Sequence, residues 1–176
     1  MIEIEIKNDS ITDMLARLDA ALTDMTPVMR DIGEYFVDST KQRFMAGTAP
    51  DGTPWAPKSE TTKASYRRRK DSVDDRPLFG PSGDLHRNIF FQADAASVSW
   101  GSTSLYSRVM QFGAAQGQFG ARMGRTRPSE KRARSQDYFF PIPWGDIPAR
   151  PFLGISPEDE DFILDELTEW LERACR

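Results

Sequence analysis

The feature that most constrains the fold is a proline-bearing segment near the carboxyl end, residues 147–156, with the sequence Ile-Pro-Ala-Arg-Pro-Phe-Leu-Gly-Ile-Ser. Pro148 and Pro151 each fix φ near about −65° and remove one backbone donor. Each also disfavours helical geometry in the residue before it, so this strap must run extended and cannot be a central strand. Ser156 and Pro157 then predict a capped helix start, followed by acids that suit a first helical turn.

The strap carries two candidate interface residues, Arg150 and Phe152. Prolines restrict the backbone near Arg150, which makes its guanidinium a candidate for a fixed salt bridge at a joint within the chain or between subunits. Phe152 supplies an apolar anchor beside it. A rigid segment of this kind, leading into a helix, is typical of a positioning device and not of an active site.

The length of 176 residues favours one domain, residues 1–176. The single cysteine, Cys175, excludes an internal disulfide and fits a reducing compartment. No apolar run approaches the roughly 18 residues of a membrane span, and the amino terminus lacks the pattern of a signal peptide. We therefore expect a soluble protein of the cytoplasm with no membrane partner.

The charges are unevenly distributed, although the net charge is only −4. Residues 156–176 hold eight acids and two arginines, whereas residues 121–134 hold one acid and six basic side chains. This asymmetry favours head-to-tail contact between copies, or orientation toward a charged partner. For the basic residues two partners stay open, DNA phosphates or an acidic protein surface. These residues are Arg122, Arg125, Arg127, Lys131, Arg132 and Arg134.

Hydrophobic periodicity predicts an α+β fold with two N-terminal helices, a small and mostly antiparallel sheet, and a C-terminal helix. The segment 59–77 is expected to be an arm that includes a short basic helix or is mobile, and 114–137 a long mobile loop. Strands and helices do not alternate along the chain, so a doubly wound nucleotide-binding fold is disfavoured. The expected helices span 11–25, 26–44, 85–89, 105–112 and 157–174, and the expected strands span 2–6, 88–93, 97–101 and 138–142.

Residues suited to catalysis are scarce. His86 is the only histidine, so a serine or cysteine nucleophile would depend on it, and a zinc site lacks ligands. The acids at 158–161 are expected to interact with the helix dipole on a solvated face instead of binding magnesium. We expect neither an enzyme nor a cofactor.

Two further groups of side chains are interface candidates. Trp55 and Trp144 lie in proline-rich loops, where a large ring either anchors an interface or packs its loop onto its own domain. Arg67, Arg68 and Arg69 lie in the arm, within reach of a neighbouring molecule.

Four motifs in fixed order resemble the phage virion morphogenesis family, the tail completion proteins of tailed phages. The resemblance covers nearly the whole chain, with one departure at Ser107, where alanine is expected more often. The motifs are the Asp-Gly-x-x-Trp loop at Asp51–Trp55, the segment 78–85, which is similar to a Leu-x-x-x-Gly-x-Leu turn of the family, the Tyr-x-x-x-x-Gln-x-Gly segment at 106–113, and the strap.

The resemblance implies a structural protein of the neck between phage head and tail, located in the virion and in the host cytoplasm during assembly. It implies a ring of six copies that matches the tail tube. The partners it implies are the head connector, the tail terminator or tube, and genomic DNA in the channel. In such a protein we expect the strap to fix the last helix against the sheet. The alternative is a DNA-binding accessory protein acting through residues 121–134.

Overall fold

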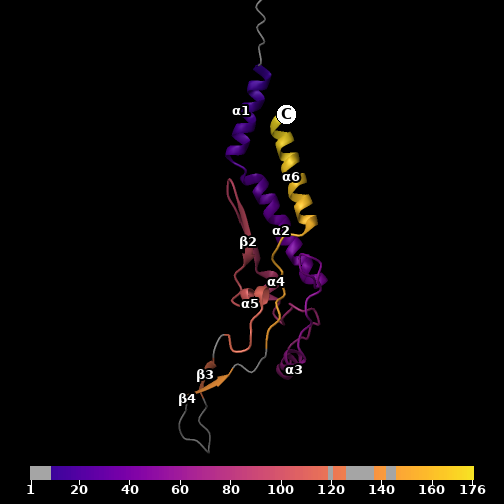
Figure 1. Ribbon diagram of the computed structural model, residues 1–176, viewed down its shortest axis with the longest axis vertical. Coiled ribbons are helices and arrows are strands. Elements are labelled where there is room, and N and C mark those ends of the chain that lie inside the picture. The colour runs from indigo at the N-terminus through magenta and orange to yellow at the C-terminus, as the bar shows by residue number, and fades with distance from the viewer. Residues whose placement is uncertain (1–8, 119–120, 126–136, 142–145) are drawn as a thin grey trace, which may run out of the picture.

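The computed structural model describes residues 9–118, 121–125, 137–141 and 146–176. The molecule is elongated, with long helices toward one end and short elements and loops toward the other (Figure 1). The fold is α+β, as the sequence predicts. The helices are α1 (Asp9–Thr23), α2 (Thr26–Ala46), α3 (Glu60–Arg69), α4 (Asp84–Arg87), α5 (Ser107–Phe112) and α6 (Pro157–Cys175), and the strands are β1 (Ile89–Ala93), β2 (Val98–Ser102), β3 (Ala121–Arg125) and β4 (Asp137–Pro141).

Helix α2 is the spine of the molecule. It begins with a proline in its first turn and ends at Gly47, whose φ of 76° permits a left-handed cap. Val28, Ile32 and Phe36 recur at helical spacing and form one buried cluster, while Phe44 belongs to a second. One helix thus joins two cores.

The β1–β2 hairpin packs against α2. Its strands are antiparallel, with Phe91 opposite Trp100. Gly33 of α2 makes the close approach possible, because a Cβ built there would lie 2.2 Å from the Phe91 ring. The Trp100 ring stacks on Phe36 with centroids 4.0 Å apart.

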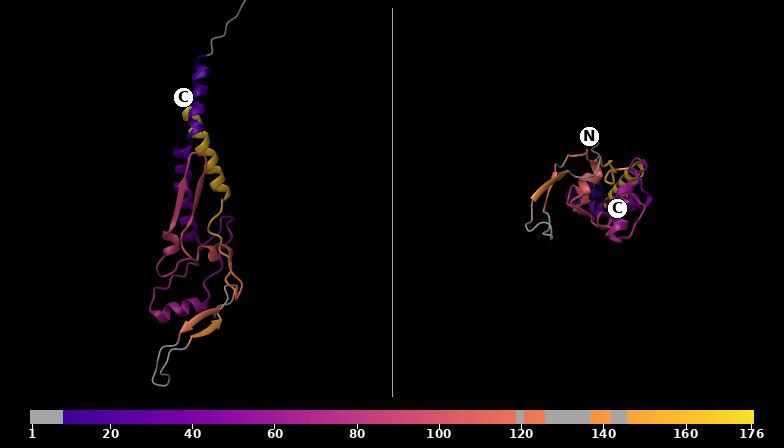
Figure 2. Two further views of the ribbon diagram at one scale, coloured as in Figure 1. Left: turned by 90° about the vertical axis from the view of Figure 1, so that its left-hand side faces the viewer. Right: turned by 90° about the horizontal axis from the view of Figure 1, so that it is seen from below.

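Helix α6 runs back along α2 and α1 and completes the first cluster (Figures 1 and 2). Phe162 stacks on Tyr35 of α2 with ring centroids 3.7 Å apart. Leu167 and Trp170 are partly buried against the same cluster, so the apolar line expected along this helix is its inner face.

Several sequence predictions are confirmed: the two N-terminal helices, the first hairpin, the short helices around residues 85 and 107, and the C-terminal helix. The arm contains a capped helix, α3, in which the Ser59 hydroxyl accepts from the Thr62 amide. The strand expected at 2–6 lies outside the described residues.

Two expectations are wrong. Residues 114–137 are not loop throughout, because β3 lies within them and pairs with β4 in a second antiparallel sheet. Glycine and arginine carry little strand propensity, so pairing across the hairpin decides the structure there. In addition, the start of α6 is held by α2 and not by the sheet, through an ion pair between Arg43 and Asp159.

Candidate interaction site

The strap is anchored along its length by short α5. Ala114 and Ile147 exchange two backbone hydrogen bonds of 2.9 and 2.8 Å, and the Arg150 amide donates to the Met110 carbonyl at 2.7 Å. The Gln111 amide oxygen accepts from the backbone of Phe152 and Leu153, both at 3.0 Å. Gln111 therefore accepts the backbone hydrogen bonds that a neighbouring strand would otherwise accept, a role that its sequence neighbours do not predict.

Arg150 fixes the strap to the loop at 47–57. Its Nε donates to the Ala56 carbonyl at 2.7 Å and its Nη2 to the Pro57 carbonyl at 2.9 Å. Only 7% of the residue is exposed, and burial lowers the pKa of its guanidinium. The predicted salt bridge is absent among the described residues; backbone carbonyls take the place of the acid.

Trp55 completes the contact between the strap and the loop at 47–57, which we call the joint. Its indole N–H donates to the Pro151 carbonyl at 2.9 Å, and its own amide donates to the Gly47 carbonyl at 2.8 Å. The ring meets Phe44 edge-on, with centroids 5.7 Å apart, and Phe152 packs against the same Phe44. The structure thus brings Trp55, Arg150 and Phe152 together as intrachain contacts, while their predicted interface role is untested.

A second network lies where the strap enters α6. Arg43 is paired with Asp159, and its Nη1 donates to the Gly154 carbonyl at 2.8 Å. The Ser39 hydroxyl and the Ser156 amide each donate to the Asp159 carboxylate at 2.7 Å. Burial raises the pKa of Asp159, but these hydrogen bonds and the Arg43 charge outweigh it and hold the pKa below its usual value.

The expectation of a solvated face is therefore wrong for Asp159, whereas its neighbours Glu158, Glu160 and Asp161 are exposed. A serine followed three residues later by an acid is the capping-box pattern, and both hydrogen bonds of that box are present. That signal was available in the sequence. The partner Arg43 was not, since it lies far away along the chain.

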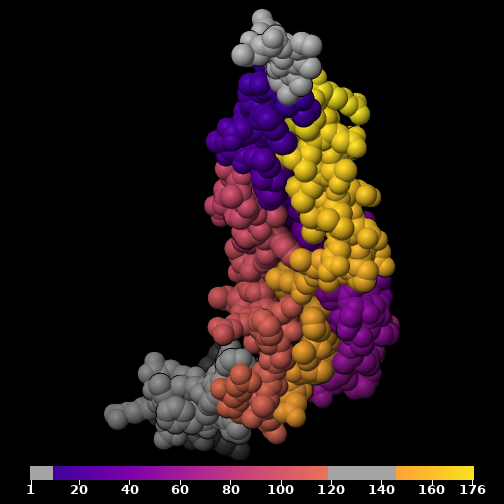
Figure 3. Space-filling model, turned by 45° about the horizontal axis from the view of Figure 1, so that its top comes forward, coloured from indigo at the N-terminus to yellow at the C-terminus, as the bar shows by residue number. Residues whose placement is uncertain are grey.

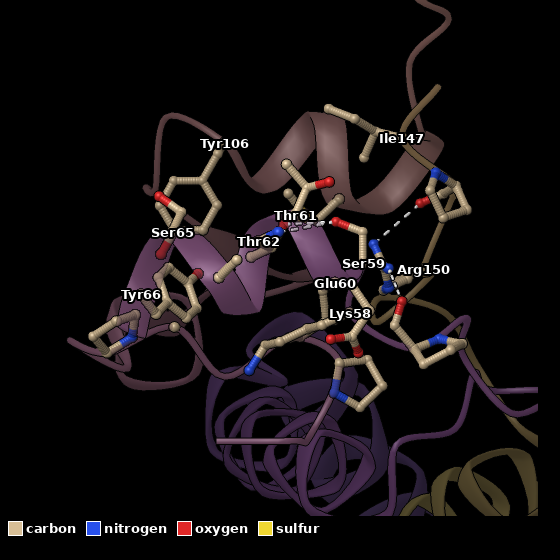
Figure 4. Close-up of a pocket in the computed structure, with 18 of the residues that line it drawn as sticks. Lys58, Ser59, Glu60, Thr61, Thr62, Ser65, Tyr66, Tyr106, Ile147 and Arg150 are labelled. Carbon is tan, nitrogen blue, oxygen red and sulfur yellow. Dashed lines mark hydrogen bonds between the residues drawn. The ribbon is translucent and has the colours of Figure 1, made fainter. Parts of the chain in front are cut away.

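An open groove lies between α3 and the joint (Figure 4). Its volume is about 1330 Å³, and its walls are α3 on one side and α5 with the strap on the other. Lys58, which directly precedes α3, anchors this helix by donating hydrogen bonds to the carbonyls of Asp74 and Phe79. Burial lowers the pKa of Lys58, partly offset by the charges of Asp74 and Asp75.

The predicted arginines of the arm lie at the C-terminal end of α3. Arg67, Arg68 and Arg69 are exposed, and Arg68 and Arg69 also line the groove. No α3 residue is buried. The structure therefore brings Arg68 and Arg69 to the same groove that Arg150 lines, and Arg67 precedes them in α3 without lining it.

The structure describes only two of the six basic residues predicted in segment 121–134. Arg122 and Arg125 lie in β3, whose hairpin with β4 projects from the lower end of the molecule (Figure 2). Four predicted basic residues and one tryptophan lie outside the described residues: Arg127, Lys131, Arg132, Arg134 and Trp144.

The sole histidine serves as a packing residue. The His86 ring lies against Phe44 and Phe79 at centroid distances of 5.7 and 5.0 Å, and burial lowers its pKa. Among the described ranges no group of His, Cys, Asp and Glu could hold a metal ion. In the part of the chain that the structure describes, no helix is both long and apolar enough to cross a bilayer.

Comparison with known proteins supplies a context for this architecture. Residues 6–172 match the model of the phage virion morphogenesis family. The chain is 30% identical over 173 residues to Mu-like prophage FluMu G protein 2 of Haemophilus influenzae, covering 98% of this chain and 97% of that protein. It is 27% identical over 165 residues to tail completion protein S of Escherichia phage P2, covering 89% and 94% respectively. No solved structure matches.

Proposed function

This chain belongs to the phage virion morphogenesis family, and on that premise we propose that it is a structural protein of the virion that completes the phage tail or joins it to the head. The observation that carries the proposal is the match over residues 6–172, together with a relative named as a tail completion protein. The proposed role is not enzymatic. It places the protein in the neck of the virion, after assembly in the host cytoplasm.

The site supports a mechanical role. Three of the four motifs that resemble the family meet in the joint: Trp55 from the loop, Gln111 from α5 and Arg150 from the strap. Hydrogen bonds between side chains and backbone amides or carbonyls hold the joint together, and these specify shape and not chemistry. A rigid joint of this kind keeps surface elements in fixed positions for partners.

We further propose that the protein acts as a ring, with six copies to match the tail tube. Heterologous contacts between identical chains generate closed rings when the rotation closes. The opposite charges of α6 and α3 suit contacts of that type. The other expected partners are the head connector and the tail terminator or tube.

Removal of the gene from the phage, with and without a plasmid copy, tests the proposal. Without the plasmid, we expect the infectious titre to collapse. Electron micrographs should then show separate heads and tails, or tails whose ends are irregular. Plasmid copies of the wild type and of His86→Ala should both restore joined particles. Normal particles in the absence of the gene would refute the proposal.

A second candidate function is DNA binding through the basic hairpin, favoured by the arginines of β3 on a projecting element. It predicts duplex binding that weakens steeply with salt, since neutralised phosphates release counterions. Changing Arg125, Arg127, Arg132 and Arg134 to alanine should then abolish binding in a fluorescence anisotropy titration. Equal DNA binding by the wild type and the four-alanine variant would exclude this alternative.

A further inference from the structure

We propose that the groove beside α3 receives the acidic outer face of α6 from a second copy of this chain. The inference rests on the proposed ring and names its intersubunit contact. Its support comes from the size of the groove, the charges of both elements and their positions along the molecule.

The groove suits a segment of protein. Small-molecule sites usually measure about 300–1,000 Å³ and enclose their ligand, whereas this groove is larger and open. Tyr106, Met110 and Ile147 give apolar surface to the side formed by α5 and the strap, and Tyr66 lines the groove from α3. Figure 4 shows Tyr66, Tyr106 and Ile147 among the lining side chains. A helix face with an apolar side chain between polar neighbours matches such a surface.

Both signs of charge line the groove: Lys58, Arg68, Arg69 and Arg150, against Glu60, Asp84 and Asp146. Two of the basic side chains, Arg68 and Arg69, belong to a basic run at the C-terminal end of α3. Arg67, Arg68, Arg69 and Lys70 follow one another where α3 ends, and all four are exposed. Arg69 already pairs with Asp71 at 2.8 Å, but Arg67 and Arg68 make no ion pair with any described residue. Glu60 lies at the other end of α3, so the basic end sets the direction in which an acidic segment would lie.

The outer face of α6 is the complement. Five acids at helical spacing are exposed along it: Glu158, Asp161, Asp165, Glu169 and Glu172. Leu164 lies beside Asp161 and Asp165 and is 63% exposed. An exposed leucine next to acids is complementary to a groove that contains both apolar side chains and arginines.

The two surfaces cannot meet within one molecule. Helix α3 lies toward one end of the long axis and α6 toward the other in both side views (Figures 1 and 2), and α6 presents an open face in the space-filling view (Figure 3). Each copy therefore has both complementary surfaces at different places, the arrangement of a heterologous contact. A second copy is the occupant to which the charges point.

Charge reversal tests the contact. Variant X carries Asp161→Lys and Asp165→Lys on α6, and variant Y carries Arg67→Glu and Arg68→Glu on α3. The control carries Glu34→Lys and Asp38→Lys on α2, which are exposed acids with the same spacing and the same change of charge. Circular dichroism melting curves verify that all three fold.

In the gene-deleted phage, we expect X alone and Y alone to lower the yield of infectious particles at least 100-fold, and the control to restore the wild-type yield. One chain that carries all four changes of X and Y should recover at least a tenth of that yield, since each contact is attractive again with reversed sign.

Co-expression of X and Y gives a sharper readout. The α6–α3 contact is attractive between an X copy and a Y copy in either order, but it is repulsive between two X copies or two Y copies. A ring can therefore close only if X and Y alternate, which requires an even number of copies. Recovery of joined particles by the mixture would support both the contact and an even copy number.

Full particle yield with X or Y alone, or failure of the four-change chain to recover activity when its fold is intact, would overturn the proposed contact. Neither result touches the proposed function, because that depends on the gene-deletion phenotype. A deletion without phenotype would remove the function itself.

Discussion

At the scale of single residues, the buried pair of Arg43 and Asp159 decides how α6 begins. We expect Asp159→Asn to lower the free energy of unfolding by about 3–5 kcal/mol, because it leaves the buried guanidinium without its counter-charge. Urea unfolding followed by circular dichroism measures this. Asp161→Asn, on the exposed side of the same turn, should change the midpoint very little.

The same carboxylate predicts a pH dependence. The pKa of Asp159 is lower in the folded protein than the value of about 3.9 in unfolded chains, so the folded protein binds its proton less well. Its stabilisation is then complete above about pH 5 and is lost as the pH falls through the folded pKa. The difference in unfolding free energy between wild type and Asp159→Asn should shrink from pH 7 to pH 3. A constant difference over that range would contradict the assignment.

Gly113 provides a test of backbone geometry at the end of α5. Its φ of 71° and ψ of −177° lie in a region that is nearly restricted to glycine, and an added Cβ would lie 2.7 Å from the Ile147 carbonyl oxygen. Gly113→Ala should therefore destabilise the protein by about 2–4 kcal/mol.

Gly52→Ala is the matched control for this variant. Gly52 also has positive φ, 80°, but no described atom lies within 4 Å of its added Cβ, so only backbone strain of about 1–2 kcal/mol is expected. Thermal melts of both variants give the comparison. Equal losses would show that the contact with the strap contributes nothing.

At the scale of elements, Arg150 couples the strap to the loop at 47–57. Arg150→Met should leave the Ala56 and Pro57 carbonyls without their donors, at a cost of about 2–3 kcal/mol. Hydrogen exchange read by mass spectrometry should speed up in residues 47–57 before it does so in α2. Arg67→Met, on the exposed surface, serves as the control. Unchanged exchange in the loop would mean that Trp55 alone holds it.

The elements also show what sequence reasoning reaches. Helices α1, α2 and α6 could be predicted because their apolar residues recur at helical spacing and prolines mark two of their starts. The strand expected at 138–142 is confirmed as β4, but its partner β3 could not be predicted, since Ala121–Arg125 has no alternating apolar pattern.

The candidate site follows the same division. The stiffness of the strap could be predicted from Pro148 and Pro151, because proline acts on its own backbone. The partners of the strap could not be predicted: Arg43 and Gln111 make contacts across the fold, and nothing in their immediate neighbours in sequence specifies them.

At the scale of the whole molecule, the proposed contact constrains the ring. If α6 of one copy meets α3 of the next, neighbouring copies are offset along their long axes, because these helices lie toward opposite ends of the molecule. In a closed ring, copies are related by pure rotation and stay level along the ring axis. The long axes must therefore be inclined to that axis, which a map of the assembled neck can show directly.

The molecule also divides into a body and an appendage. β3 and β4 pair with each other and not with β1 or β2, and the ends of their excursion are joined by the hydrogen bonds between Ala114 and Ile147. Replacing residues 117–144 by four residues such as Gly-Asn-Gly-Ser should therefore shift the melting temperature by no more than about 2 °C, which corresponds to about 0.5–1 kcal/mol in a chain of this size.

If the appendage serves a partner, the shortened protein should be folded but unable to restore joined particles to the gene-deleted phage. A loss of melting temperature above about 5 °C, more than 1 kcal/mol for this length, would instead make the hairpin part of the folded body. Shortened protein that restores infectivity fully would exclude the basic hairpin, and with it DNA contact through Arg122 and Arg125, from the function of the protein.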